Sequence, residues 1–132
     1  MGLLHEDKTD KIIKTFYDVY NALGYGFLEK VYEAAFVIEL SKSGFDVKRQ
    51  SPIKIHYDGQ IIGDYYCDLI IDDLILIEIK SVETLVIAHQ KQTINYLKAS
   101  KYEVALLLNF GDVPQVKRLL FTNDRKPLLN KK

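Results

Sequence analysis

The sequence predicts a single α/β domain in which two helices precede three strands, a further helix and two final strands. Three observations predict this class. Apolar residues recur at helical spacing before Gly44 and again after Lys80. The segments between and after these helices show the period of two, or the continuous apolar run, of β-strands. A length of 132 residues, of which 48% are hydrophobic, suits one packed domain. We therefore treat residues 1–132 as one domain, with residues 1–7 and 124–132 expected to be frayed tails.

Two helices are predicted in the first third of the chain. From Lys8 to Leu23, apolar side chains recur three and four residues apart, and Gly24 is suited to end this helix. A second helix is expected from about Leu28 to Ser43, and Gly44 ends it. Its apolar face consists of Leu28, Val31, Tyr32, Ala35, Phe36 and Leu40.

Three strands are predicted after Gly44. The first contains Ser51-Pro52, where the missing N–H of proline either interrupts pairing or marks an edge strand. Asp58-Gly59 predicts a two-residue hairpin turn. The return strand runs from Gln60 to Ile71, with Gly63 as a candidate bulge, and a tight turn at Asp72-Asp73 leads into the third strand. This third strand, Leu74 to Lys80, is largely a continuous apolar run, as in a strand that is buried on both faces.

The remaining segments predict one helix and two strands. The helix is expected from Leu85 to Ser100, with Ile87, Ile94 and Leu97 facing the core. The segment from Glu103 to Phe110 is apolar enough for a buried strand, and Val116 to Phe121 predicts a more exposed last strand.

Composition narrows the classes of function. The 18 Lys and Arg residues balance 18 Asp and Glu residues, whereas a protein that coats nucleic acid is usually basic. Any contact with nucleic acid would then need a local basic patch, a bound cation or a partner. The chain has no apolar run long enough for a transmembrane helix and no apolar core of a signal peptide. Cys67 is the single cysteine, which excludes an intrachain disulfide and fits a reducing cytoplasm, and core packing is its expected role.

The strand that ends in Glu78-Ile79-Lys80 carries the first candidate site. Glu78 and Lys80 share one face of this strand, and Asp68 lies on the strand that should pair beside it. Two neighbouring carboxylates repel each other unless a cation relieves them, and Mg²⁺ commonly binds one or two carboxylates while it keeps several waters. A lysine beside such an ion can position a water or stabilise charge on a phosphate. The alternative is an aspartate at a strand end and a Glu–Lys pair on the rim of the sheet.

Two helices supply further candidates. Glu29 lies near the start of the second helix, where it either complements the helix dipole or points inward from the edge of the apolar face. His89, Gln92 and Tyr96 form one stripe on the later helix. Gln92 can hydrogen-bond a phosphate or a water, and Tyr96 can orient it, although a solvated polar face explains the same stripe.

Taken together, these residues resemble a known enzyme family. Asp68 followed by Glu78-Ile79-Lys80 is similar to the signature of the PD-(D/E)XK nuclease superfamily, and the order of helices and strands resembles its core. Gln92 to Tyr96 resembles the Gln-x-x-x-Tyr motif of the RecB-like branch. The segment Gly26 to Tyr32 matches the Gly-x-x-Glu-x-x-Tyr motif that names the GxxExxY family, and Leu106 to Gly111 is also similar to that family.

The resemblance implies a restriction-endonuclease-like αβββαβ core, with a mixed central sheet flanked by helices and one extra N-terminal helix. It implies that Glu29, Asp68 and Glu78 are metal ligands, with the carbonyl of Ile79 as a further candidate. Lys80, Glu78, Asp68 and Gln92 are the implied catalytic residues, and Tyr96 and His89 support them. The implied cofactor is Mg²⁺ or Mn²⁺. Two positions depart from the family pattern: Cys67 replaces a proline, and Tyr66 stands where many relatives have an arginine.

The expected function is therefore a metal-dependent nuclease that hydrolyses DNA or RNA phosphodiester bonds with a metal-activated water. Its expected partner is nucleic acid, DNA before RNA, without a membrane. A homodimer or a protein partner is a further expectation, since the exposed last strand could pair across a two-fold axis. The alternative is a catalytically inert module with a nuclease fold that binds nucleic acid or a protein. A structural α/β domain without either role is the third reading.

Overall fold

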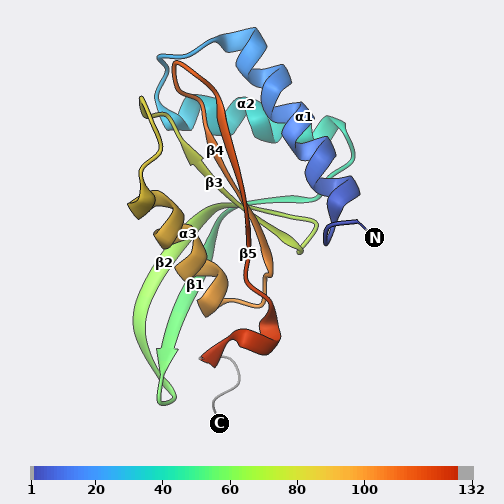
Figure 1. Cartoon of the computed structure of the whole chain (residues 1–132). Coiled ribbons are helices and arrows are strands. Elements are labelled where there is room, and N and C mark those ends of the chain that lie inside the picture. The colour runs from blue at the N-terminus through green and yellow to red at the C-terminus, as the bar shows by residue number, and fades with distance from the viewer. Residues whose placement is uncertain (1, 128–132) are drawn as a thin grey trace.

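A computed structural model of the chain describes residues 2–127. Its elements follow the predicted order. They are α1 (Glu6–Leu23), α2 (Glu29–Lys42), β1 (Val47–Tyr57), β2 (Gln60–Ile71), β3 (Ile75–Lys80), α3 (Ile87–Ala99), β4 (Val104–Asn109), β5 (Gln115–Leu120) and the short 3-10 helix η1 (Asn123–Arg125). Figure 1 shows them along the chain.

The five strands form one mixed sheet in the order β1-β2-β3-β4-β5. Only β3 and β4 run parallel, and α3 connects them, as a parallel pair requires a crossover. The other neighbouring pairs are antiparallel. The sheet thus places the C-terminal ends of β3 and β4 side by side, with Lys80 opposite Asn109.

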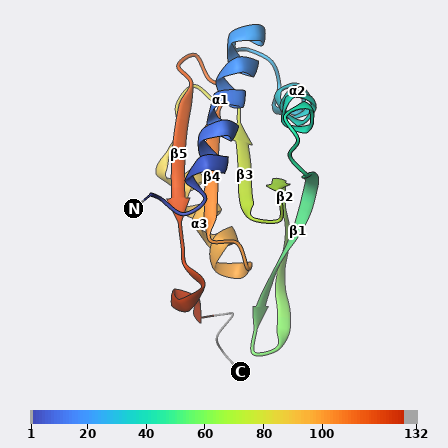
Figure 2. The same cartoon turned by 90° about the vertical axis from the view of Figure 1, so that its right-hand side faces the viewer.

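Two hydrophobic clusters cover the two faces of the sheet. Helices α1 and α2 pack on one face through Ile12, Phe16, Tyr32, Phe36 and Leu40, all fully buried. Helix α3 packs on the other face, where Tyr96 and Leu97 meet Cys67, Ile70, Leu76 and Ala105. Figures 1 and 2 show α1 and α2 towards one end of the sheet, and Figure 1 shows α3 next to the β1–β2 hairpin, which it contacts through β1.

An aromatic group joins the first helices to the sheet. Phe110 follows β4 and stacks on Tyr32 with ring centroids 4.3 Å apart. Phe16 packs edge-on against the ring of Phe110, with centroids 4.6 Å apart. The Tyr32 hydroxyl donates to the Gly24 carbonyl at 2.6 Å and accepts from the Phe27 N–H at 3.2 Å. Tyr32 therefore fixes the loop between α1 and α2, in which Gly24 and Gly26 have φ values of 69° and 112°.

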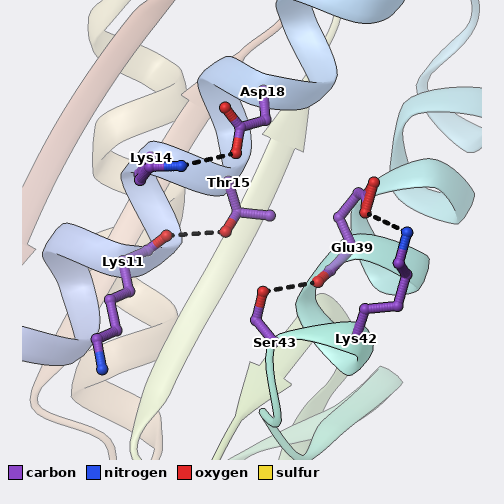
Figure 3. Close-up of polar contacts among 7 residues, drawn as sticks. All are labelled: Lys11, Lys14, Thr15, Asp18, Glu39, Lys42 and Ser43. Carbon is purple, nitrogen blue, oxygen red and sulfur yellow. Dashed lines mark hydrogen bonds and ion pairs between the residues drawn. The ribbon is translucent and has the colours of Figure 1, made fainter.

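Several polar contacts of α1 and α2 are local, within a single helix (Figure 3). Lys14 pairs with Asp18 at 3.2 Å and Lys42 with Glu39 at 3.4 Å, each within one helical turn. Thr15 donates to the Lys11 carbonyl at 2.9 Å. Exposed pairs of this kind contribute little to stability, so the buried clusters must hold these helices in place.

The strand predictions are confirmed, and the structure decides between the two interpretations of Ser51-Pro52. Strand β1 continues through Ser51 and Pro52, which pair with Cys67 and Tyr66, so the proline marks an edge strand and does not interrupt it. The register shifts next to Gly63, as its candidate bulge predicted. Positive φ values at Asp58 and Gly59, and again at Asp72 and Asp73, confirm both tight turns.

Some helix predictions were wrong. Leu28 is 80% exposed and Ile87 is 69% exposed, although both were expected to face the core. Each lies at the N-terminal boundary of its helix, where the helix has only begun and its face is not yet covered. Their helical periodicity was correct, but it does not say where the opposing layer ends.

The expected tails are shorter than predicted. Helix α1 begins at Glu6, inside the expected N-terminal tail. At the other end η1 forms, and Lys126 is fully buried with its ammonium donating to the carbonyls of Ser100 and Tyr102 at 2.8 and 2.5 Å. The rest of the C-terminal prediction, residues 128–132, lies outside the described residues. Within residues 2–127, no helix combines the length and the apolar character that crossing a bilayer requires.

Candidate active site

The candidate site lies where β2 and β3 separate. The two strands pair through Leu69–Ile77, Ile70–Leu76 and Ile71–Ile75. The next residues in this register are Asp68 and Glu78, and their side chains take over from the backbone ladder. Asp68 Oδ2 accepts a hydrogen bond from the Ile79 N–H at 2.6 Å, and Glu78 Oε2 accepts one from the Asp68 N–H at 2.8 Å. Each carboxylate thereby holds the opposite strand and keeps its second oxygen for another partner (Figure 2 shows the two strands diverging).

Burial and mutual repulsion act on both carboxylates. Glu78 is 5% exposed, and its burial, followed by the nearby charge of Asp68, raises the pKa of its carboxyl group. Burial also raises the pKa of Asp68, with smaller contributions from Glu33 and Glu29. Where two neighbouring carboxyl groups both have raised pKa values, a bound cation stabilises their charged forms.

Lys80 provides one positive charge next to this pair. It ends β3, is half-buried, and lies on the same face of the strand as Glu78. Its charge lowers the pKa of Glu78. Among residues 2–127, its ammonium has no hydrogen-bond or ion-pair partner, so it is available to an incoming group.

Glu29 approaches the pair from α2 without joining it. It is the first residue of α2 and is exposed, as charge complementation at a helix N-terminus would place it. Its charge nevertheless raises the pKa of both Asp68 and Glu78, so the three carboxylates lie in one electrostatic neighbourhood. Within the described residues 2–127, no three His, Cys, Asp or Glu side chains form a group that could hold a metal ion. The structure therefore brings Asp68 and Glu78 together and leaves Glu29 at the rim.

A second acidic residue of α2 was not recognised in the sequence. Glu33 is buried, and its Oε2 accepts from Arg49 Nε at 3.1 Å and Nη2 at 2.9 Å. Its Oε1 accepts from the Gln50 amide at 3.0 Å. The signal was present, because Glu33 follows Glu29 by one turn and precedes the buried Phe36 by three residues, which puts an acid into an apolar stripe.

Gln50 links this network to the carboxylate pair. Its φ of 49° is uncommon for a residue with a side chain, and it lies on β1 opposite Asp68, between the pairs Arg49–Leu69 and Ser51–Cys67. The Gln50 side chain also lies beside Asp68, where its amide N–H lowers the pKa of that carboxyl group. Glu33 thus holds Gln50 in a strained conformation next to a candidate ligand, which is typical of functional sites.

Of the three residues expected on helix α3, Tyr96 borders the site, Gln92 lies beside it, and His89 does not take part. Tyr96 is buried, and the pKa of its phenol rises to about 12 through burial and through the charge of Glu78. Gln92, one turn earlier, is exposed on the same side of α3 and lines a cavity with Tyr96. His89 is elsewhere engaged: its Nδ1 accepts from the Val86 N–H at 3.2 Å and so stabilises the start of α3.

The loop that follows Lys80 is held by a buried amide. Asn109 is fully buried, and its side chain accepts from the Val82 N–H and donates to the Val82 carbonyl, both at 2.9 Å. It also donates to Gln115 Oε1 at 3.0 Å, which in turn accepts from the Leu85 N–H at 3.0 Å. A Cβ atom at Gly111 would approach the Val82 carbonyl to 2.4 Å, so only glycine fits there. These contacts explain why an asparagine and a glycine occupy positions 109 and 111.

The donor set fits a hard divalent cation. Asp68 and Glu78 offer carboxylate oxygens, the ligands that Mg²⁺ prefers, and two carboxylates with water are a common set for this ion. Burial is the largest cause of the raised pKa of both groups, and a bound cation would offset this cost of charging them. The carbonyl of Ile79 as an additional ligand stays a prediction.

Comparison with known proteins agrees with this geometry. The family model of the PD-(D/E)XK nuclease superfamily matches residues 6–119, which span α1 to β5. No curated protein and no solved structure matches the chain. The mixed five-stranded sheet with helices on both faces is consistent with the restriction-endonuclease-like fold. The chain therefore belongs to the PD-(D/E)XK nuclease superfamily.

Proposed function

We propose that the protein is a Mg²⁺- or Mn²⁺-dependent nuclease that hydrolyses phosphodiester bonds of DNA or RNA, with DNA as the first choice. One observation carries this proposal. The carboxylates of Glu78, which is buried, and Asp68, which is half-buried, lie side by side where β2 and β3 separate. Lys80 lies on the same face as Glu78, and its ammonium has no partner among residues 2–127. Membership of a superfamily of nucleases supports the same reaction class.

In this proposal Asp68 and Glu78 hold the cation, and Glu29 at the rim contributes negative charge or a bridging water. The bound ion would polarise a phosphoryl oxygen and lower the pKa of a water. Lys80 stabilises the negative charge of the phosphate through its ammonium, or orients the attacking water. Gln92 contacts the phosphate or that water from α3, and Tyr96 closes the site behind it and excludes solvent.

The finer family assignment is also a proposal. Gly26, Glu29 and Tyr32 carry the GxxExxY motif, and the structure gives two of them a local purpose: Tyr32 organises the loop before α2, and Gly26 adopts a φ of 112°. The motif thereby builds the turn that delivers Glu29 to the site. Gln92 and Tyr96 support assignment to the RecB-like branch.

Two contextual proposals accompany the activity. The buried and unpaired Cys67 fits a reducing cytoplasm. Strand β5 lies at one edge of the sheet, so pairing of two copies along it would produce a homodimer. Light scattering tests the dimer, and a molar mass of one chain at micromolar concentration would contradict it.

The activity is tested by comparing cleavage of single- and double-stranded DNA and RNA by the wild type and by Lys80→Ala, in Mn²⁺ and in EDTA. We expect Mn²⁺-dependent cleavage that Lys80→Ala reduces at least 100-fold, since positioned charge in a reaction site is typically worth that factor. Lys117→Ala, on the exposed side of β5, is the matched control and should cleave normally.

A separate binding measurement tests the metal site without relying on activity. Calorimetric titration with Mn²⁺ should show binding to the wild type and its loss in Asp68→Asn. Cleavage that survives Lys80→Ala would refute the assignment of the reaction to this site. Nucleic acid that is bound but never cut, together with absent Mn²⁺ binding, would instead identify an inert member of the superfamily.

A further inference from the structure

A cavity beside the candidate active site is lined in part by residues that the proposed reaction does not use, namely Tyr65, Lys91 and Asn95. It measures about 360 Å³ and lies between α3 and the β1–β2 hairpin, which Figure 1 shows side by side. Tyr65 and Ile55 of the hairpin form one wall. Tyr96, Gln92, Asn95 and Lys91 of α3 form the other.

The cavity combines an accessible aromatic ring with polar groups that have no partner. Tyr65 is 47% exposed, and its ring lies 5.9 Å from that of Tyr96 at an angle of 39°. Within the described part of the chain, the side chains of Lys91 and Asn95 make no hydrogen bond or ion pair. Both lie one turn apart on the same face of α3.

This combination corresponds to the parts of an unpaired nucleotide. An aromatic face stacks on a base, a carboxamide pairs with a base edge, and a lysine contacts a phosphate. The exposed Tyr65 ring can stack on a base only if that base has left its own stack, as in a single strand. Because the chain has no net charge, such local contacts have to replace a general basic surface.

The cavity is also adjacent to the carboxylate pair. The Tyr65 ring lies 5.9 Å from that of Tyr96, and Tyr96 belongs to the same buried cluster as Cys67, the residue that precedes Asp68 on β2. Tyr96, in the opposite wall, lies close enough to Glu78 and Asp68 for their charges to raise the pKa of its phenol. A phosphate at Lys80 would thus be followed by a sugar and base within reach of Tyr65.

We propose that this cavity binds one unpaired nucleotide next to the scissile phosphate, with its base stacked on Tyr65, so that the enzyme acts on single-stranded segments. The proposal rests on the proposed nuclease function and names its substrate class. Asn95 contacts the edge of the base, and Lys91 contacts the adjoining phosphate.

Binding is measured by fluorescence anisotropy of a labelled eight-nucleotide thymidine oligonucleotide in EDTA, where no cleavage occurs, and with a duplex of the same length. We expect the wild type to bind the single strand more tightly than the duplex. Tyr65→Leu should weaken single-strand binding roughly 5- to 100-fold, the range for one base on one aromatic ring.

Two further variants keep the test independent of folding. Asn95→Asp changes an exposed helix residue and should weaken binding by introducing repulsion of the phosphates. Tyr66→Leu is the matched control, because Tyr66 is the next residue of the same strand, is exposed, and points to the opposite face. It should bind the oligonucleotide as the wild type does.

The outcomes separate this proposal from the nuclease assignment. Unchanged single-strand affinity in both Tyr65→Leu and Asn95→Asp would overturn the nucleotide subsite, even if the wild type cleaves in Mn²⁺. Equal loss of duplex and single-strand affinity would overturn the requirement for an unpaired base. Binding that depends on Tyr65, in a protein that shows no cleavage, would support the subsite and refute the nuclease proposal alone.

Discussion

Replacing Glu33 by glutamine tests the buried network that connects α2 to β1. The carboxylate of Glu33 accepts three N–H groups, two from Arg49 and one from Gln50, at 2.9 to 3.1 Å. The Glu33→Gln side chain has the same shape but only one accepting oxygen. Its own NH₂ group must then face either the guanidinium or the Gln50 amide, which places donor against donor.

The expected cost follows from burial on the two sides of the network. Hydrogen bonds to a charged group contribute about 1.5–3 kcal/mol, and a fully buried ion pair that loses one partner costs about 3–5 kcal/mol. The Arg49 side chain is 49% exposed, so water can replace part of what it loses, and the full buried value does not apply. We therefore expect unfolding to become easier by about 2 kcal/mol, or roughly 7 °C in melting temperature for a chain of 132 residues.

Urea denaturation followed by circular dichroism measures this difference. Glu39→Gln is the matched control, because Glu39 is on the same helix but pairs with Lys42 only at the surface, as Figure 3 shows. This control should change the free energy of unfolding by less than about 0.5 kcal/mol. A Glu33→Gln variant as stable as the control would refute the view that Glu33 anchors Gln50 and the first strand.

Three further changes have defined outcomes. Asp72 accepts from Lys8 at 2.6 Å and from the Asp46 N–H at 2.8 Å, and the contact with Lys8 is the main reason that its pKa is lowered. The pKa of Asp72 is lower in the folded state than in the unfolded state. Its contribution to stability is therefore fully present above the unfolded pKa of about 3.9 and is lost as the pH falls through the folded pKa. Urea denaturation should show Asp72→Asn less stable than the wild type at pH 7 and nearly equal to it at pH 2. The Gln50→Gly variant loses an amide hydrogen bond but relieves the strain of a φ of 49°, so its free energy of unfolding should stay within about 1 kcal/mol of the wild-type value. Calorimetry should show weaker Mn²⁺ binding. Unchanged Mn²⁺ affinity would contradict a role of Gln50 beside Asp68. The Asn109→Ala variant leaves the backbone of Val82 without its buried partner, so urea denaturation should show a free energy of unfolding lower by about 2–3 kcal/mol. Cleavage should also fall, because the loop after Lys80 loosens. Full activity would show that this loop does not position Lys80.

The order of the elements could be predicted from local patterns. The 3.6-residue period of α1 and the glycine after it, the Asp58-Gly59 turn and the apolar run that ends in Lys80 each depend on a few neighbouring residues. These patterns predict the elements because each helix or strand buries one face, so its apolar residues recur at the period of that element. The predictions failed at boundaries, as at Leu28 and Ile87, where exposure depends on how far the opposing layer extends.

The candidate site was predictable only in part. Asp68, Glu78 and Lys80 could be chosen because alternation along strands places residues on faces. The roles of Glu29 and Glu33 could not be separated, since both are acids of one helix face and differ by one turn. Their surroundings differ: Glu29 meets solvent, whereas Glu33 meets Arg49 and Gln50 of β1, 16 and 17 residues later in the chain. Local periodicity does not show which strand residues a helix will meet.

Local sequence thus specified which segments are helices and strands and which side chains carry charge into an apolar strand. Chain packing specified that β2 and β3 separate at Asp68 and Glu78, that Glu33 is satisfied by β1, and that a cavity forms between α3 and the hairpin. The reason is physical: periodicity arises from neighbours within a few residues, whereas hydrogen-bond partners, burial and pKa shifts depend on groups that only the folded chain brings together.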